Sequence, residues 1–92
     1  MAETIGKIVL CYDINSKHNQ VKDSLKELGY SDRWKKISTN VTYDMPNTTV
    51  WHPTKTVSQA TADIRRVCNN LGVVLERSFS ALTGSEVDGY NQ

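Results

Sequence analysis

Asp13 is the residue whose type and position most clearly suggest chemistry. It follows the apolar run Ile8-Val9-Leu10-Cys11-Tyr12, which is short and rich in β-branched and aromatic side chains, as strands are. The carboxylate is therefore expected at the C-terminal end of a buried strand, where open α/β-type sheets commonly place functional groups. Such a carboxylate can bind a metal ion, or it can accept backbone N–H bonds at the start of a following helix.

Two histidines could transfer protons near Asp13. His18 falls in the first turn of the helix expected after that strand, and His52 falls at the end of a later strand. Imidazole titrates near neutral pH, so either side chain could act as a general acid or base. Either could equally be a solvated or hydrogen-bonded side chain. Serine, histidine and aspartate occur at no spacing that singles out a nucleophile.

Basic residues and one tryptophan form a candidate surface for RNA or DNA. The cations are Arg33, Lys35 and Lys36 near the start of the second strand and Arg77 in the last strand, and Trp51 could stack on a base. The alternative for the cations is a solvated face, and for Trp51 a place in the core or an interface. The formal net charge is only +1, so nucleic-acid binding would have to come from a local patch.

Length and composition indicate one soluble domain. The chain has 92 residues, 38% hydrophobic and 23% charged, which is typical of a small globular protein. No stretch approaches the ~18 apolar residues of a membrane span, and the N-terminus lacks a secretory signal pattern. We therefore expect a cytoplasmic protein without membrane contact. Cys11 and Cys68 are expected to be reduced and buried, and their spacing to the histidines does not predict a zinc site.

The hydrophobic pattern predicts six segments. In the first strand, Ile8, Leu10, Tyr12 and Ile14 share one face. A helix is expected at about residues 16–28, capped by Asn15 or Ser16 and ended by Gly29. Residues 30–44 fit either one long bent strand or a small hairpin. A further strand, residues 48–52, is expected to end at Pro53.

The second half of the chain has the clearest helix start. Thr56-Val57-Ser58-Gln59 matches a capping box. Ala60, Ile64, Val67 and Leu71 lie on one face of this helix, Asp63 is expected elsewhere on it, and Gly72 ends it. The last strand is expected over residues 73–82, with a shared face formed by Val73, Leu75, Phe79 and Ala81.

This order predicts an α+β, ferredoxin-like βαββαβ fold, with a four-stranded antiparallel sheet and both helices on one face. The domain would span residues 1–82, followed by a flexible tail, residues 83–92. The face without helices would carry apolar side chains, and such patches are usually covered by a partner. We therefore expect a homodimer packed sheet to sheet through Val9, Cys11, Trp51, Val74 and Leu82.

Two short motifs resemble a known family. Tyr12-Asp13-Ile14 closing the first strand and Thr49-Val50-Trp51 in a later strand look like the small CRISPR adaptation nucleases and the related virulence-associated protein D toxins. The resemblance implies a ferredoxin-like dimer in which Asp13 of each subunit flanks a divalent metal such as Mg²⁺. The sequence also departs from the family pattern, since its second strand has no clear match and residues 46–53 are more elaborate than the family needs.

Two functions follow from these observations. The first is a small dimeric, non-catalytic binding or regulatory module, which could associate with nucleic acid. The second is a metal-dependent endonuclease or toxin-like ribonuclease that uses Asp13 from each subunit. We favour the first, because resemblance in fold alone does not carry an activity.

Overall fold

The computed structural model describes residues 3–36 and 41–83. The elements of this part are β1 (Gly6–Ile14), α1 (His18–Glu27), β2 (Arg33–Lys36), β3 (Val41–Asp44), β4 (Thr49–Lys55), α2 (Val57–Leu71) and β5 (Leu75–Thr83). The predicted α+β class is confirmed. Of the two alternatives for residues 30–44, the hairpin is the one observed, since β2 and β3 pair antiparallel. Thr83 ends β5, and the predicted tail beyond it lies outside the described residues.

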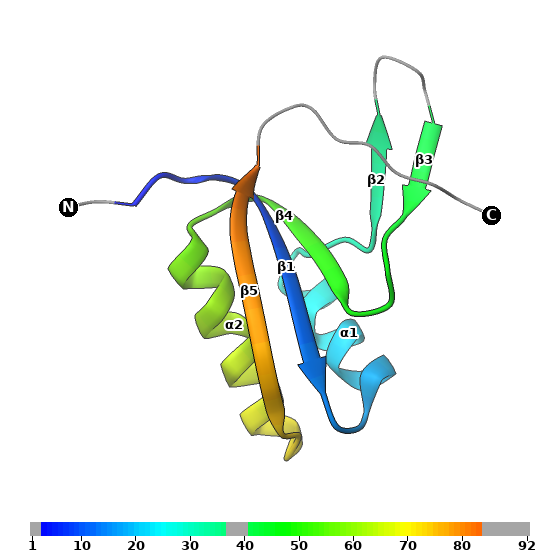
Figure 1. Ribbon diagram of the computed structural model, residues 1–92, viewed down its shortest axis with the longest axis vertical. Helices are drawn as coiled ribbons and strands as arrows, with labels where there is room; N and C mark the ends of the chain where they lie inside the picture. The colour runs from blue at the N-terminus through cyan, green and yellow to red at the C-terminus, as the bar shows by residue number, and fades with distance from the viewer. Residues whose placement is uncertain (1–2, 37–40, 84–92) are drawn as a thin grey trace.

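The main sheet has three antiparallel strands in the order β4-β1-β5. As expected, β1 is central, and both helices lie behind the sheet while its other face looks toward the viewer (Figure 1). We call this second face the open face. A four-stranded order is not confirmed, because β2 pairs with β3 in a separate hairpin.

Residue Ser31 explains why the hairpin leaves the sheet. Ser31 forms a single antiparallel bridge with Trp51 of β4, but its hydroxyl then bonds both the N–H and the carbonyl of Arg33. Such a local bond competes with sheet pairing and turns the chain. Trp34 is thereby placed against Trp51, with their ring centroids 4.5 Å apart.

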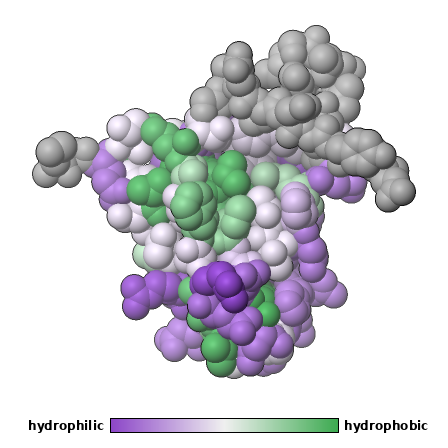
Figure 2. Space-filling model, in the orientation of Figure 1, coloured by the Kyte–Doolittle hydropathy of each residue, from purple (hydrophilic) through white to green (hydrophobic). Residues whose placement is uncertain are grey.

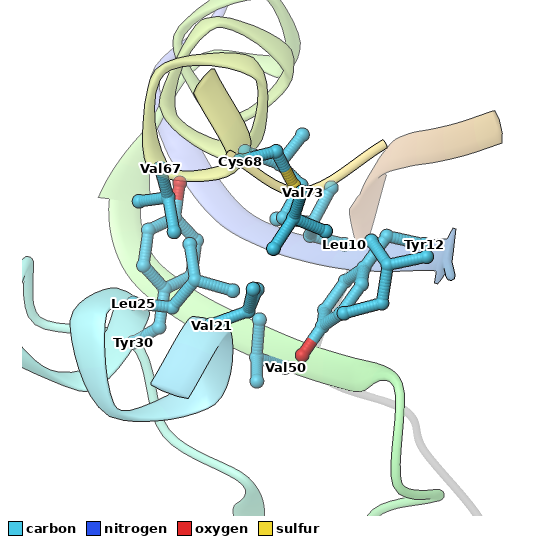
Figure 3. Packing of buried hydrophobic residues seen from close by; sticks show 11 residues of the cluster. Leu10, Tyr12, Val21, Leu25, Tyr30, Val50, Val67, Cys68 and Val73 are labelled. Atoms are coloured by element: carbon cyan, nitrogen blue, oxygen red, sulfur yellow. The ribbon is translucent and has the colours of Figure 1, made fainter. Parts of the chain in front are cut away.

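The core lies between the sheet and the two helices. As predicted, Ile8, Leu10, Tyr12 and Ile14 of β1 are all buried. Leu10, Tyr12 and Ile14 belong to one packed cluster, and Figure 3 shows how side chains of β1, β4 and both helices meet in it. The cluster also contains Val21, Leu25, Tyr30, Val50, Ile64, Val67, Cys68 and Val73. At about 1.5–3 kcal/mol for each fully buried large apolar side chain, this cluster is the main source of stability.

The helix ends were largely predicted by the local sequence. Thr56 and Gln59 form the expected capping box, with bonds of 3.1 and 2.9 Å. Gly29 and Gly72 both have positive φ, as expected for residues that end helices. The cap predicted for α1 was wrong, because Lys17 occupies that position in a left-handed conformation without a side-chain cap bond. The Asn15 side chain instead accepts a hydrogen bond from the N–H of Val74.

A bulge carries β4 past the proline that was expected to end it. Between the pairs Gly6–Lys55 and Ile8–His52, β4 has one residue more than β1. Pro53 lies in this irregular stretch, where a strand tolerates proline because no ladder bond is lost. The N–H of Thr54 bonds the Nδ1 atom of His52 instead of the neighbouring strand.

A second bulge reverses the predicted faces of β5. Ile14 pairs with Leu75 and Asp13 pairs with Arg77, so Glu76 is the extra residue. Leu75 lies toward the helices as expected, but beyond the bulge Phe79 and Ala81 pair with Cys11 and Val9 and share the open face with them. Leu82 pairs with Ile8 and therefore lies on the helix side. The prediction for β5 was wrong from Arg77 onward, because one inserted residue shifts the two-residue period.

In the described residues, neither helix has the length and apolar character needed to cross a membrane.

Candidate functional site

Asp13 and Arg77 form an ion pair on the open face. They are directly opposite in the β1–β5 register, and Nε of Arg77 lies 2.9 Å from Oδ2 of Asp13. The side chains are 53% and 76% exposed for Asp13 and Arg77 respectively. A pair this exposed contributes only about 0–1 kcal/mol to stability, so both groups remain accessible to a partner. The sequence had assigned them separately, Asp13 to a metal and Arg77 to nucleic acid.

The two histidines do not gather around Asp13. His18 begins α1 and is exposed at the same end of the sheet as Asp13. His52 pairs with Ile8, five residues along β1 from Asp13, which corresponds to about 16 Å. Its ring packs edge-on against Tyr30, on the helix side of the sheet. The predicted grouping of His52 with Asp13 is therefore not found.

The environment of His52 disfavours its charged form. Burial lowers the pKa of the imidazole, and the nearby ammonium group of Lys55 lowers it further. Its Nδ1 atom accepts a hydrogen bond from the backbone N–H of Thr54, which a proton on that nitrogen would break. His52 is thus a packing and hydrogen-bonding residue in this structure.

The candidate nucleic-acid residues fall into separate groups. Arg33 forms an exposed ion pair with Asp44, 3.1 Å apart, and its carbonyl accepts a hydrogen bond from Nε1 of Trp51. Arg33 and Trp51 therefore lie together, while Arg77 is on β5, with β1 between it and β4. The side chains of Lys35 and Lys36 lie outside what the structure describes. Trp51 is partly covered by Trp34, so its ring is not a fully open stacking platform.

Apolar side chains form a continuous group on the open face. Phe79 is 68% exposed, and its pairing partner Cys11 is half-buried. Val9 lies beside them, with Ala81 on one side and Trp51 on the other. Figure 2 shows hydrophobic surface gathered over β1 and β5, next to a strongly hydrophilic area. We call Val9, Cys11, Trp51, Phe79 and Ala81 the open-face patch.

Three members of the open-face patch were predicted from the sequence and two were not. Val9, Cys11 and Trp51 are on this face as expected, whereas Leu82 lies on the other side and Phe79 and Ala81 replace it. Val74 is exposed, but it lies outside β5, in the connection after α2. Phe79, the most exposed large apolar side chain in the described part of the chain, was missed because of the bulge at Glu76.

A buried polar cluster was also missed by the sequence analysis. Asp63 is only 5% exposed and is the one buried charged side chain among the described residues. Its Oδ2 atom accepts a hydrogen bond of 2.7 Å from the Tyr30 hydroxyl and forms an ion pair with Lys55. The spacing Ala60, Asp63, Ile64, Val67 would have placed Asp63 on the buried face of α2. Burial and the bond to Asp63 raise the pKa of Tyr30 far above its usual value.

The described part of the chain contains no cluster of metal-binding side chains. In residues 3–36 and 41–83, no three histidine, cysteine or acidic side chains lie close enough together to hold an ion. Asp13 offers one carboxylate, already engaged by Arg77, whereas Mg²⁺ needs near-octahedral oxygen ligands. The Cys68 thiol is buried, and this burial raises its pKa, which makes it unreactive.

Comparison with known proteins returned no matching family model, no matching curated protein and no matching solved structure.

Proposed function

We propose that this protein is a small non-catalytic binding module that self-associates through its open-face patch. The observation that carries the proposal is Phe79, a large aromatic side chain that is 68% exposed and pairs with Cys11 in an apolar group across three strands. An isolated exposed apolar residue needs no explanation, but a contiguous patch usually marks an interface. The patch is formed by three neighbouring strands and is therefore held rigidly.

A second copy of the chain is the occupant that fits this surface. Charged residues flank the patch at both ends of β1: Asp13 forms an ion pair with Arg77, and Lys7 lies beyond Val9 on the same face, over the Trp34 ring. The ion pair adds no net charge to the face at which two copies would meet. A twofold axis would bring two Phe79 side chains together and let each Arg77 approach the partner's carboxylate. Full burial of Phe79 contributes about 1.5–3 kcal/mol per chain, and aromatic pairing adds to it.

The fold we propose is a ferredoxin-like one whose fourth strand is reduced. The order β5-β1-β4 matches three strands of that arrangement. The Ser31–Trp51 bridge stands where the fourth strand would pair with β4. This supports the resemblance to the CRISPR adaptation nucleases and virulence-associated protein D toxins in outline, and it leaves their activity as a separate question.

Sedimentation of the purified protein at micromolar concentration tests the proposal. We expect the mass of two chains for the unaltered protein and of one chain for Phe79→Asp, because the charge cannot be buried unpaired. Val74→Asp is the matched control, since Val74 is also exposed but lies outside the patch. A monomeric unaltered protein, or a dimer that survives Phe79→Asp, would contradict the proposal.

A metal-dependent nuclease is the second candidate. The observation in its favour is that Asp13 lies on the open face, where a sheet-to-sheet partner would bring a second carboxylate near. RNA and DNA are incubated with the protein, with and without Mg²⁺ or Mn²⁺. Cleavage that is lost in Asp13→Asn but kept in Arg77→Gln would support a ligand role, since both variants break the same ion pair. No metal-stimulated cleavage, or cleavage unchanged in Asp13→Asn, removes this candidate.

A further inference from the structure

The outer edge of β5 is unpaired among the described residues. The sheet order places β5 at one margin of the sheet, beside α2 (Figure 1). Natural proteins usually protect a long edge strand with charges, proline or bulges, or by covering it. In β5 the bulge and the charges Glu76 and Arg77 are confined to its start, and residues 78–82 are Ser-Phe-Ser-Ala-Leu.

The register shows which backbone groups face outward. The N–H of Tyr12 donates to the carbonyl of Thr48, so the even-numbered residues of β1 direct their backbone groups toward β4. The odd-numbered ones, including Val9 and Cys11, then direct theirs toward β5. Since these pair with Ala81 and Phe79, the backbone groups of Ser78, Ser80 and Leu82 turn away from β1.

A groove runs beside this edge along α2. One hollow, of about 580 Å³, is lined by Arg65, Arg66 and Asn69 of α2 and by Leu75 of β5. A second, of about 430 Å³, continues from Arg65 to Ser80. A hydrogen bond of 3.2 Å between Thr61 and Ser80 joins the helix and the strand within this stretch. The groove thus offers backbone donors and acceptors on one side and side chains on the other.

The charge of the groove indicates what it would bind. Arg65 and Arg66 are both exposed, and among the described residues no acidic side chain lines either hollow. Asp63 approaches Arg66 at 3.8 Å, but it is buried and already engaged by Lys55 and Tyr30. A second copy of β5 would bring a second Arg65 and Arg66 with its own α2, which is unfavourable. Nucleic acid would suit the arginines but cannot extend a sheet.

We propose that the groove between α2 and β5 binds an extended acidic peptide segment of another protein, which adds a strand to β5. The peptide backbone pairs with Ser78, Ser80 and Leu82, and its acidic side chains on the helix side reach Arg65 and Arg66. This surface is distinct from the open-face patch, so the proposal holds whether or not the chain dimerises.

A labelled octapeptide of alternating valine and glutamate is the probe, followed by fluorescence anisotropy. We expect saturable binding, which is lost when alternate peptide amides are N-methylated and when lysine replaces glutamate. Arg65→Glu should weaken binding about tenfold or more, because an attraction becomes a repulsion. Binding that is equal for the lysine peptide, or absent for every peptide, would overturn the proposal.

Ser80→Pro tests the strand pairing itself. Proline removes the outward N–H at this position, while the bonds between β5 and β1 stay, so binding should fall about tenfold or more with the circular dichroism unchanged. Ser80→Ala is the matched control, since it loses the hydroxyl but keeps the N–H, and it should bind normally. If Ser80→Pro unfolds the chain, the N-methylated peptide decides the same point. Binding of a uridine oligonucleotide that depends on Arg65, without peptide binding, would assign the groove to nucleic acid and overturn the proposal.

Discussion

The hydroxyl of Tyr30 donates a hydrogen bond of 2.7 Å to the buried carboxylate of Asp63. This bond joins the segment after α1 to α2, and Figure 3 shows the Tyr30 hydroxyl directed toward α2. Tyr12 is buried to a similar degree, yet its hydroxyl has no hydrogen-bond partner among the described residues. The two tyrosines therefore form a natural comparison between a paired and an unpaired buried hydroxyl.

Tyr30→Phe should destabilise the fold by about 1.5–3 kcal/mol, since the lost hydrogen bond is to a charged group. Among the described residues, Asp63 then keeps the cations Lys55 and Arg66 as partners. Urea unfolding followed by circular dichroism measures the change in the free energy of unfolding. A loss below about 0.5 kcal/mol would show that Lys55 alone satisfies the carboxylate.

Tyr12→Phe should change the free energy of unfolding in the opposite direction to Tyr30→Phe, or leave it unchanged. The Tyr12 side chain is 3% exposed, and burial raises its pKa to about 12, which reflects poor solvation of the charged form. Removing an unpaired buried hydroxyl is expected to leave stability unchanged or to raise it by about 1 kcal/mol. The same urea titration applies, and a loss comparable to that of Tyr30→Phe would reveal a partner for the hydroxyl.

Acid should weaken the fold through His52. Burial, assisted by the charge of Lys55, lowers the pKa of His52 in the folded state, so below about pH 6.5 the unfolded chain binds more protons than the folded one. Stability contributed by neutral His52 is present above that pH and is lost as the pH falls toward the folded-state pKa. Thermal unfolding between pH 7.5 and 5 should show a smaller decline in His52→Gln. His18→Gln, at the exposed start of α1, is the control.

Gly29→Ala should be more costly than Gly72→Ala. Both glycines have positive φ, at 97° and 67°, so each alanine takes on backbone strain of about 1–2 kcal/mol. At Gly29 a new Cβ would also lie 2.8 Å from Nε2 of His52, whereas at Gly72 nothing lies within 4 Å. Urea unfolding of the two variants compares them directly. Equal losses would mean that the His52 ring moves aside at no cost.

The sequence predicted what depends on neighbouring residues. The capping box at Thr56 and the glycines that end both helices require only local patterns, and they are found as expected. The central position of β1 followed from its two apolar faces. The α1 cap was wrong because Asn15 has a competing partner, the N–H of Val74, which lies far away in the chain.

The features that were missed depend on register and on distant contacts. The Asp13–Arg77 pair exists because β1 and β5 align those positions, and no local signal sets that alignment. Likewise, Trp34 meets Trp51 only because the hairpin leaves the sheet after Ser31. The candidate site was therefore half predicted: Val9, Cys11 and Trp51 were expected on the open face and Asp13 at the end of β1, whereas Phe79 was overlooked.

The extra residue Glu76 has an evolutionary consequence. Loss of the codon for Glu76 would remove the bulge and leave Phe79 paired with Cys11, so the outer surface of β5 would keep its apolar side chains. A codon added between Arg77 and Phe79 would instead shift the two-residue alternation, turn Phe79 and Ala81 toward the helices and turn the serines outward. One inserted codon is thus enough to replace an apolar exterior by a hydroxyl-rich one.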